Sequence, residues 1–571
     1  MTGHYQNIIS SSAADPRVRR FAAPERIVWH SEEDGSVRNM DILLSPGSGQ
    51  ATLWARPGCV LAHGSTPSSI VLDFGREVYG GIQLIIGRAE KRVPVKLHVR
   101  LGESVSEVMG TPDNDHAIHD SVIEAAVSGA TEFGNTGFRF VRIDTVDPGR
   151  EVEIKEVRAV ILMRDLEYAG SFKSSDPRLD DIWMTGAYTL HLCLQDYVWD
   201  GIKRDRLVWI GDLHPETVTA AAVFGKLDVV EKSLDLARDE TPLPDFMNGT
   251  VAYSLWWIII HDFWFRMYGD IDYLREQQAY MCPLLRQMAG YADDNGRENL
   301  PEWRFLDWPT SENKAALHAG LQALLCMAMD AGSRLAGILG DAETGSVCTD
   351  AAQRLRGYVP DPEGIKQVSA LQVLAGMTDA ADSNRTILSR NPFSGISTFY
   401  GYYVLQARAL AEDIQGALDL IRTYWGGMLD AGATAFWEHF ELEWLENASR
   451  IDELPRPGTR DIHADCGAFC FKGLRHSLCH GWASGPTAWL SEHVLGIRPL
   501  EPGMKRIAVS PRLGNLEWVR GTFPTLYGPA AVEHTRNNDG SIHTEVSVPD
   551  EVSPDIFNQR LCGRPGGRSM M

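Results

Sequence analysis

Hydrophobic and polar residues follow two different periods along the chain, and the changes of period divide it into three regions. Up to about residue 168 the two kinds of residue alternate one by one in places, as from Val95 to Leu101, and Phe138 to Asp144 is another short run. A period of two is typical of half-buried strands. Further short apolar runs cover Ser69 to Phe74 and Gly81 to Ile86. Many short strands separated by Gly and Pro predict an antiparallel β-sandwich over residues 1–168.

From about residue 169 to residue 496 the apolar positions recur with the helical period. Asp176-Pro177 combines a capping residue with a proline suited to a first helical position, and apolar residues then recur from Leu179 to Tyr197. Further helices are expected over residues 213–224, 227–239, 251–268, 271–292, 315–338, 342–356, 397–411, 413–427 and 484–495. So many helices joined by loops fit an α/α toroid, although a bundle or a solenoid also fits this pattern. We see no repeat of fixed length that would favour the solenoid.

Residues 497–571 return to the period of strands. Ile542 to Val548 alternate apolar and polar positions, and Asn538-Asp539-Gly540 before them is typical of a hairpin turn. We therefore predict a small C-terminal β-domain. The segment from Ser553 to the last residue is rich in Pro and Gly, and we expect it to be a poorly ordered, flexible tail.

Charge and composition exclude several classes of partner. The formal net charge is −22, so a nucleic acid or an anionic membrane would be repelled, whereas a neutral sugar would not. No apolar run is long enough to span a membrane, and Met1 to Arg20 lacks the apolar core of a signal peptide. Nine cysteines at irregular spacing indicate free thiols rather than a disulfide framework. We therefore expect a cytoplasmic protein; the oligomeric state stays open.

Aromatic residues stand beside carboxylates at several loops of the helical region. The pairs are Trp199-Asp200, Trp209 near Asp212, Asp307-Trp308 and Trp437-Glu438. Sugars present apolar C–H faces and polar hydroxyl rims, so aromatic faces combined with carboxylates suit both of their surfaces. The stretch from Asp200 to Asp212 carries carboxylates and cations interleaved with tryptophans, which a merely solvated loop does not need. These pairs predict a carbohydrate-binding site.

Three segments carry a resemblance to a known family. Asp200, Arg204, Arg206, Trp209, Gly211 and Asp212 match in register the Asp-x-x-x-Arg-Glu-Arg-x-x-Trp-x-Gly-Asp signature of glycoside hydrolase family 78, the bacterial α-L-rhamnosidases. Gly432-Ala-Thr-Ala-Phe-Trp-Glu438 is similar to the family's Gly-Ala-Thr-Thr-x-Trp-Glu segment. Ser477-Leu-Cys-His480 resembles its Ser-x-x-His segment. The resemblance runs from about residue 70 to about residue 550.

The resemblance implies a six-hairpin glycosidase with an (α/α)6 barrel over residues 169–496, which removes terminal α-L-rhamnose with inversion and needs no cofactor or metal. By position, Glu438 matches the general base, and Asp205 stands where the family has its general acid. Asp200 and Asp212 match carboxylates that hold sugar hydroxyls. The remaining matches line the sugar subsite: Arg204, Trp209, Trp308 and His480.

One departure from the family pattern leaves alternatives open. Asp205 replaces a glutamate and shortens the reach of the acid by one methylene group, about 1.5 Å, a displacement to which catalysis is sensitive. The chain could therefore hydrolyse a different sugar on the same barrel, or bind sugar without turnover. Single residues also have structural explanations: Asp212 as a helix cap, His480 and Trp308 as core, and Glu438 as a surface residue.

Overall fold

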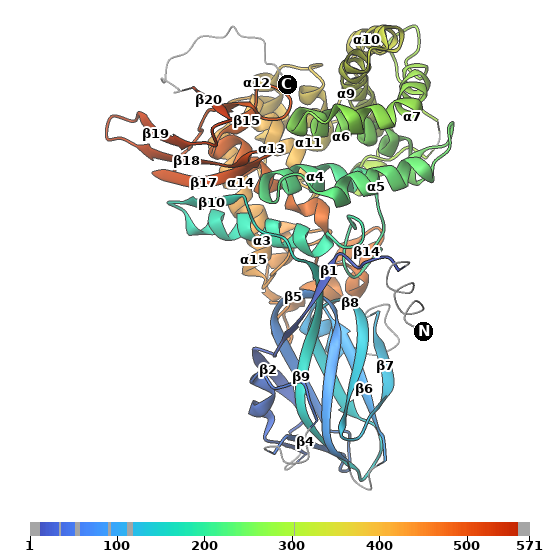
Figure 1. Cartoon of the computed structure of the whole chain (residues 1–571), viewed down its shortest axis with the longest axis vertical. Helices are drawn as coiled ribbons and strands as arrows, with labels where there is room; N and C mark the ends of the chain where they lie inside the picture. The colour runs from blue at the N-terminus through green and yellow to red at the C-terminus, as the bar shows by residue number, and fades with distance from the viewer. Residues whose placement is uncertain are drawn as a thin grey trace, which may run out of the picture.

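A computed structural model of the chain describes residues 12–32, 36–51, 57–89, 93–110, 118–301 and 303–557. An N-terminal sheet domain lies at one end of the long axis, the helical domain lies at the other, and the C-terminal strands lie beside the helices (Figure 1). Of the sequence predictions, the first eleven residues and the tail beyond residue 557 lie outside the described residues.

The N-terminal domain is one antiparallel sheet of nine strands, as far as the structure describes it, in the order β3-β4-β9-β5-β8-β6-β7, with β1 on β9 and β2 on β5. The strands are β1 (Arg17–Ala22), β2 (Arg26–His30), β3 (Val37–Arg38), β4 (Cys59–Ala62), β5 (Ser69–Ala89), β6 (Val95–Gly102), β7 (Asp120–Ala125), β8 (Gly129–Thr145) and β9 (Glu151–Arg164). A short helix, α2 (Val105–Met109), follows β6.

The two short strands expected at Ser69 to Phe74 and Gly81 to Ile86 are a single long strand, β5, and in this respect the prediction was wrong. Its pairing with β8 shifts register near Asp73 and again at Gly80. Gly80 has a φ of 140°, and a Cβ there would lie 2.0 Å from the carbonyl oxygen of Val160. The glycine therefore permits a bulge within one strand rather than ending it.

The helical domain begins as predicted: α3 starts at Pro177, and the N–H of Arg178 donates to the Asp176 carboxylate at 3.0 Å. Its helices are α3 (Pro177–Cys193), α4 (Ile210–Val223), α5 (Asp228–Asp239), α6 (Val251–Tyr268), α7 (Ile271–Ala289), α8 (Trp308–Ser311), α9 (Lys314–Leu339), α10 (Ala342–Arg356), α11 (Lys366–Leu374), α12 (Ala380–Ser383), α13 (Gly401–Leu410), α14 (Ile414–Leu420), α15 (Gly426–Asp430), α16 (Ile462–Asp465) and α17 (Gly485–Trp489). Trp183 of α3 and Trp489 of α17 are buried in the core of this domain.

Six of these helices contact one another in cyclic order: α4 contacts α6, followed in turn by α9, α11, α13 and α17, and α17 contacts α4 again. Helices α5, α7, α10, α12 and α14 are the ones that alternate with them along the chain. Helix α11 was not expected from the sequence. Loops between the helices also carry four two-residue strands: β11 (Ala448–Ser449), β12 (Arg460–Asp461), β13 (Gly467–Ala468) and β14 (Phe471–Lys472).

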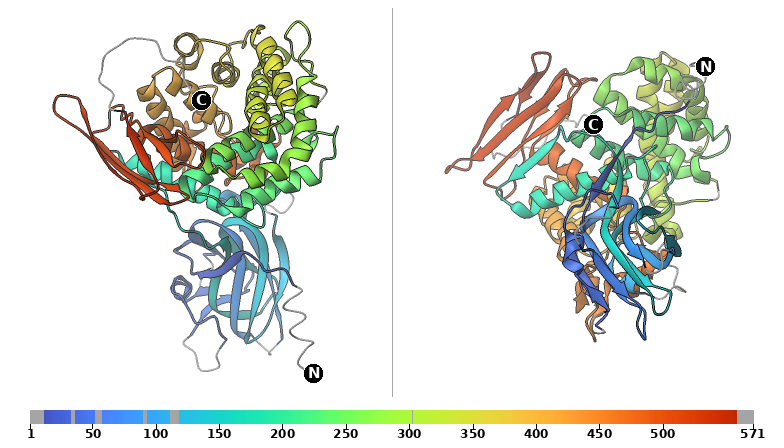
Figure 2. Two further views of the ribbon diagram at one scale, coloured as in Figure 1. Left: turned by 45° about the horizontal axis from the view of Figure 1, so that its top comes forward. Right: turned by 60° about the horizontal axis from the view of Figure 1, so that its bottom comes forward.

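Two sheets form the C-terminal part, and its strands lie alongside the helices, away from the N-terminal sheet (Figure 2). One sheet joins β10 (Ser171–Ser174), β17 (Trp518–Thr525), β18 (Gly528–Arg536) and β19 (Ile542–Ser547), with the predicted hairpin between the last two. The other joins β15 (Ile497–Pro499), β16 (Arg506–Val509) and β20 (Ser553–Ile556).

Two expectations about this part change. Strand β10 lies within the residues predicted as helical but pairs with β17, so it extends the C-terminal sheet. The tail predicted from Ser553 was wrong for its first residues, because Ser553–Ile556 pairs with β16 as β20. Among the helices that the structure describes, none is long and apolar enough to cross a membrane.

Candidate active site

The loop from Asp200 to Asp212 is organised around the carboxylate of Asp200, which is buried. The backbone N–H groups of Asp205 and Leu207 donate to its two oxygens at 2.8 and 2.9 Å. The Asp200 carbonyl oxygen accepts from the N–H of Gly481 at 2.7 Å. One aspartate therefore shapes the loop that carries Asp205 and joins it to the segment of His480.

His480 stands among three carboxylates that come from distant parts of the chain. Its Nε2 lies 3.6 Å from Asp200 Oδ2, 3.9 Å from Asp212 Oδ2 and 4.0 Å from Glu438 Oε1. Asp212 lies in the first turn of α4 and also accepts from the hydroxyl of Tyr253 at 3.2 Å. The structure thus brings together four of the predicted site residues. The N-cap of α4 is Trp209, so Asp212 is not its capping residue.

Burial controls the protonation of this cluster. Burial raises the pKa of Asp200 to about 7. The two backbone N–H donors oppose this rise, and the charge of Asp205 adds to it. Burial and then Asp200 raise the pKa of Asp212 well above its ordinary value. Burial lowers the pKa of His480 to about 3. At neutral pH the site therefore combines a neutral imidazole with carboxyl groups that hold protons readily.

Glu438 is held by its backbone and side chain together. The N–H of Glu438 donates to the Ser477 carbonyl at 3.0 Å, and the N–H of Ser477 donates to Glu438 Oε2 at 3.3 Å. The Glu438 carbonyl accepts from the indole N–H of Trp482 at 2.9 Å. Burial raises the pKa of Glu438 to about 8, opposed by the Ser477 N–H and assisted by the charges of Asp200 and Asp205. Glu438 is therefore not a surface residue.

Aromatic rings surround the Glu438 carboxylate in a small pocket. Trp308 and Glu438 both line it, together with Asp307, Pro309, Ser397, Thr398, Phe399, His439, Phe471 and Trp482. Phe399 stacks on Trp482 with ring centres 4.8 Å apart and planes 6° apart. An apolar ring surface beside carboxylates suits the two surfaces of a sugar. Phe399 and Trp482 were not predicted, although Trp482 is two residues from His480.

The other predicted residues lie on or near the Asp200 loop. Trp209 is half-buried and meets Tyr253, the partner of Asp212, edge to face at 6.0 Å. Arg204 is half-buried, and a cis peptide bond joins it to Asp205, which is exposed. The guanidinium of Arg206 donates to the carbonyl of Asn135 in the N-terminal sheet domain at 2.8 Å. Asp205 is therefore exposed, whereas Asp200 and Asp212 are buried.

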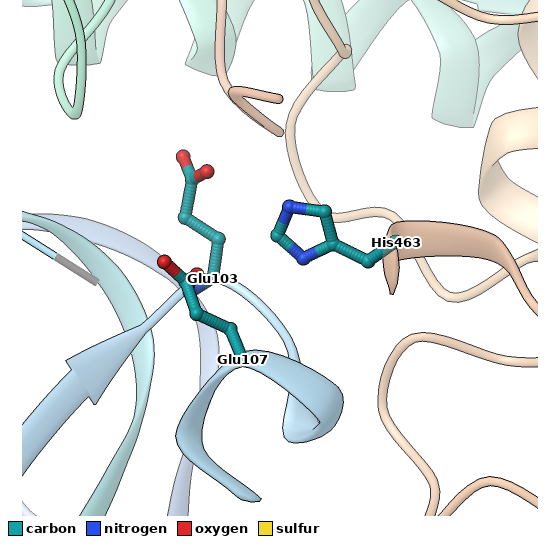
Figure 3. Close-up of side chains that lie close together, drawn as sticks. All are labelled: Glu103, Glu107 and His463. Atoms are coloured by element: carbon teal, nitrogen blue, oxygen red, sulfur yellow. Dashed lines mark hydrogen bonds between the residues drawn. The ribbon is translucent and has the colours of Figure 1, made fainter. Parts of the chain in front are cut away.

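A second buried cluster lies beside the site. Glu103 and Glu107 project from the N-terminal domain toward His463 (Figure 3), and their ligand atoms lie within 4.8 Å of one another. Carboxylates with an imidazole can ligate a metal ion. Here the Lys203 ammonium ion-pairs with Glu107 at 2.8 Å and with Glu103 at 3.3 Å. The cation that ion-pairs with both glutamates is therefore a lysine of the Asp200 loop.

Comparisons with known proteins point to one family. The family model described as the bacterial alpha-L-rhamnosidase 6 hairpin glycosidase domain matches residues 167–358, and that of the bacterial alpha-L-rhamnosidase C-terminal domain matches residues 496–557. An alpha-L-rhamnosidase of Alteromonas sp. (strain LOR) is 24% identical over 546 residues, which cover 86% of this chain and 55% of that protein. The chain spans about half the length of the curated relatives it matches.

Solved structures share the fold. The GH78 family rhamnosidase of Bacillus sp. GL1 superposes with a TM-score of 0.71 at 20% identity, covering 90% of this chain and 55% of that chain. The Klebsiella oxytoca rhamnosidase with rhamnose bound superposes with a TM-score of 0.65 at 21% identity, covering 84% of this chain and 96% of that chain. The arrangement of a helical domain with sheet domains is therefore shared with these rhamnosidases.

Proposed function

The chain belongs to the bacterial α-L-rhamnosidase family through its helical and C-terminal domains, and on that premise we propose that it is a glycoside hydrolase that removes terminal α-L-rhamnose from oligosaccharides or glycosides. We also infer that the helices form an (α/α)6 barrel and the N-terminal strands a β-sandwich. The cyclic order of contacts among α4, α6, α9, α11, α13 and α17 supports the barrel.

The reaction proceeds with inversion in one displacement. The carboxylic acid of Asp205 protonates the leaving glycosidic oxygen, and the carboxylate of Glu438 removes a proton from the water that attacks the anomeric carbon from the opposite face. Such a pair stands roughly 6.5–9.5 Å apart to leave room for the water. The C–O bond to the leaving group breaks as the bond to water forms, so both products carry a hydroxyl group.

The observation that carries this proposal is the meeting of three carboxylates at one imidazole. Asp200, Asp212 and Glu438 all lie within 4.0 Å of His480 Nε2, and Glu438 also lines the aromatic pocket. An aspartate side chain can donate a hydrogen bond to a sugar hydroxyl when it is protonated and accept one when it is ionised. We assign Asp200, Asp212 and His480 to the hydroxyl groups and Trp308 to an apolar face of the sugar, with Arg204 and Trp209 along its rim.

The pKa of Glu438 has a consequence for the pH dependence. A general base must be ionised, and the pKa of about 8 leaves most of Glu438 protonated at pH 7 in the free enzyme. The active form needs Glu438 ionised and the general acid protonated, so the pH profile of kcat/KM is expected to be bell-shaped, with one limb near pH 8. A profile without a limb near pH 8 would contradict the raised pKa of Glu438.

The deciding experiment uses proton NMR to follow hydrolysis of an aryl α-L-rhamnoside whose leaving group needs protonation, with Glu438→Gln and Asp205→Asn beside the wild type. We expect β-L-rhamnose as the first product, with turnover lost or strongly reduced in both variants. First release of α-L-rhamnose would exclude inversion. Hydrolysis of other glycosides in place of the rhamnoside would mean a different sugar on the same fold.

A second candidate function is sugar binding without turnover, and the exposed, shortened side chain of Asp205 favours it, because one methylene group less moves the carboxyl group away from the leaving oxygen. Titration calorimetry with L-rhamnose separates the two functions. Binding by a wild-type protein that hydrolyses no glycoside of a broad panel would support the binding protein. Turnover above that of the Glu438→Gln variant would exclude it.

A further inference from the structure

Lys203 is a buried lysine of the Asp200 loop. It connects the N-terminal sheet domain with the chain segments beside Asp205 and Glu438. Lys203 is two residues before Asp205, and its side chain is 1% exposed. Its ammonium contacts Glu107 at 2.8 Å and Glu103 at 3.3 Å, and both of these carboxylates are fully buried. The loop of the proposed acid is therefore tied to the N-terminal domain through charge and hydrogen bonds.

The same ammonium reaches the segment that holds the proposed base. It donates to the carbonyl of Leu474 at 2.9 Å and to that of His476 at 3.3 Å. The carbonyl of the next residue, Ser477, accepts from the Glu438 N–H, and the Ser477 N–H donates to the Glu438 carboxylate. One cation thus contacts the backbone beside Glu438 while it belongs to the chain segment of Asp205.

Glu103 makes further contacts with Ser477 and Leu478, which lie beside Glu438. The N–H of Leu478 donates to Glu103 Oε2 at 2.8 Å, and the Ser477 hydroxyl donates to Glu103 Oε1 at 3.4 Å. Glu107 accepts from the backbone N–H of Glu103 at 2.7 Å, which holds the carboxylates in one geometry. Two contacts with Glu103 and two with Lys203 therefore converge on residues 474–478.

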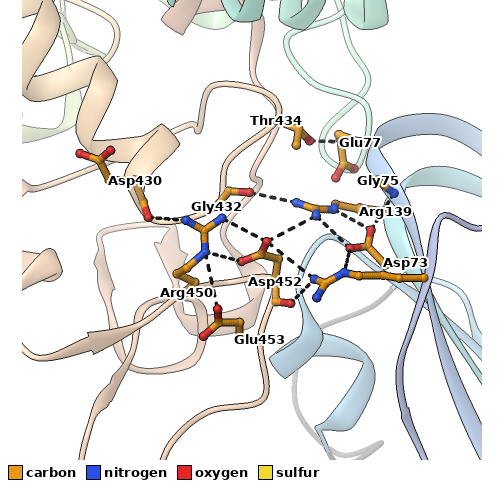
Figure 4. A network of polar contacts seen from close by, with 11 residues as sticks. Asp73, Gly75, Glu77, Arg139, Asp430, Gly432, Thr434, Arg450, Asp452 and Glu453 are labelled. Atoms are coloured by element: carbon orange, nitrogen blue, oxygen red, sulfur yellow. Dashed lines mark hydrogen bonds and ion pairs between the residues drawn. The ribbon is translucent and has the colours of Figure 1, made fainter. Parts of the chain in front are cut away.

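A second set of contacts from the N-terminal domain holds residues 432–434, which precede Glu438 in the chain (Figure 4). Arg139 ion-pairs with Asp73 and donates to the carbonyl of Gly432 at 2.9 Å. The N–H of Glu77 donates to the hydroxyl of Thr434 at 2.8 Å. Gly432 and Thr434 precede Glu438 by six and four residues, so this domain supports the segment of the base on both sides.

Stability alone does not account for such a cluster. Moving two carboxylates and an ammonium group out of water costs free energy. In many buried ion pairs this cost exceeds the attraction between the charges, and apolar residues of similar volume are often as stabilising. What a fully hydrogen-bonded buried cation does supply is a single fixed geometry, and catalysis loses about 100-fold for a displacement of about 1 Å.

We propose that Lys203 is a positioning residue: held by Glu103 and Glu107, it sets the placement of Asp205 relative to Glu438, which makes the N-terminal sheet domain a part of the catalytic apparatus. This inference rests on the proposed function, since it takes Asp205 and Glu438 as the reacting pair. Lys203 itself contacts no reacting atom and acts through the two segments that it joins.

The test compares Lys203→Met with Lys226→Met in the full chain. Lys226 is a matched control because it also bridges two carboxylates, Glu231 at 3.0 Å and Asp270 at 2.6 Å, outside the site. We expect Lys203→Met to lower kcat on an aryl α-L-rhamnoside by about 100-fold while KM changes less than about threefold. Lys226→Met should keep the wild-type kcat. An unchanged kcat in Lys203→Met would overturn the proposal.

A double variant separates positioning from charge compensation. Lys203→Met leaves two buried carboxylates without their cation and can destabilise the fold, whereas Lys203→Met/Glu107→Gln removes one of those charges as well. We expect the double variant to recover melting temperature but not kcat. Recovery of both would mean that Lys203 only neutralises buried charge, and the proposal would be wrong.

Hydrogen–deuterium exchange gives a readout that does not depend on activity. In Lys203→Met or the double variant, peptides covering residues 200–207 and 473–480 should both exchange faster than in Lys226→Met, while the core of α9 stays protected. Unchanged exchange in either loop would refute the coupling. Faster exchange in both loops, in a protein whose wild type hydrolyses no rhamnoside, would keep the coupling and reject the proposed function.

Discussion

Replacing Glu438 by Gln is expected to abolish turnover and, at the same time, to stabilise the folded protein above neutral pH. Gln keeps the volume and can accept the hydrogen bond that the Ser477 N–H donates at 3.3 Å, but it cannot take a proton from water. Loss of a general base lowers kcat by about 10²–10⁴-fold. The expected gain in stability has a separate cause, the burial of an ionisable group.

The size of that gain follows from the pKa of Glu438, which burial raises from its ordinary value of 4.5 to about 8. The folded state binds the proton more tightly than the unfolded state, so wild-type stability falls as pH rises from about 4.5 to about 8. At about 1.4 kcal/mol per pKa unit, the cost reaches on the order of 3 kcal/mol at pH 7 and is absent near pH 4.5. Gln carries no such cost at any pH.

Differential scanning calorimetry of wild type and Glu438→Gln from pH 4.5 to pH 9 tests this reasoning, with Glu443→Gln as the control because Glu443 is exposed on the same segment. We expect equal stability at the acid end, a gap that widens toward pH 8 in favour of Glu438→Gln, and no gap for Glu443→Gln. A wild type that is more stable than Glu438→Gln at pH 8 would mean that Glu438 is ionised and well paired in the fold, and the argument from burial would be refuted.

Three further predictions concern the acid and the sugar pocket. Asp205→Asn should lose most activity on an alkyl α-L-rhamnoside but keep activity on a dinitrophenyl rhamnoside, whose leaving group needs no protonation; equal losses on both would exclude Asp205 as the acid. Asp205→Glu should raise kcat on the poor leaving group, since it restores the missing methylene; a fall in kcat would show that the loop is built for the shorter residue. Trp308→Ala should raise KM for the rhamnoside about tenfold or more through lost ring contact, with a smaller effect on kcat, measured by steady-state kinetics; an unchanged KM would place Trp308 outside the sugar site.

Local chemistry made several elements predictable from the sequence. The cap and proline at Asp176-Pro177 mark the first residue of α3, and the turn at Asn538 to Gly540 marks the hairpin of β18 and β19. In both places neighbouring residues alone decide the backbone conformation. Helix α11 escaped prediction because it carries polar residues such as Lys366 and Gln372 that are nonetheless buried, so its hydrophobic pattern is weak. Its place among α9 and α13 stabilises it instead.

The sequence by itself determined the candidate site residues and the motifs that resemble the rhamnosidase family. Only the tertiary structure decided how those residues meet, because Asp200, Asp212 and Glu438 approach His480 from segments up to about 280 residues apart, and no local pattern encodes such contacts. The same holds for protonation, since a pKa of about 8 for Glu438 depends on burial by side chains that fold around it. It holds also for Lys203, whose sequence neighbours give no sign of Glu103 and Glu107, the buried partners that another domain supplies.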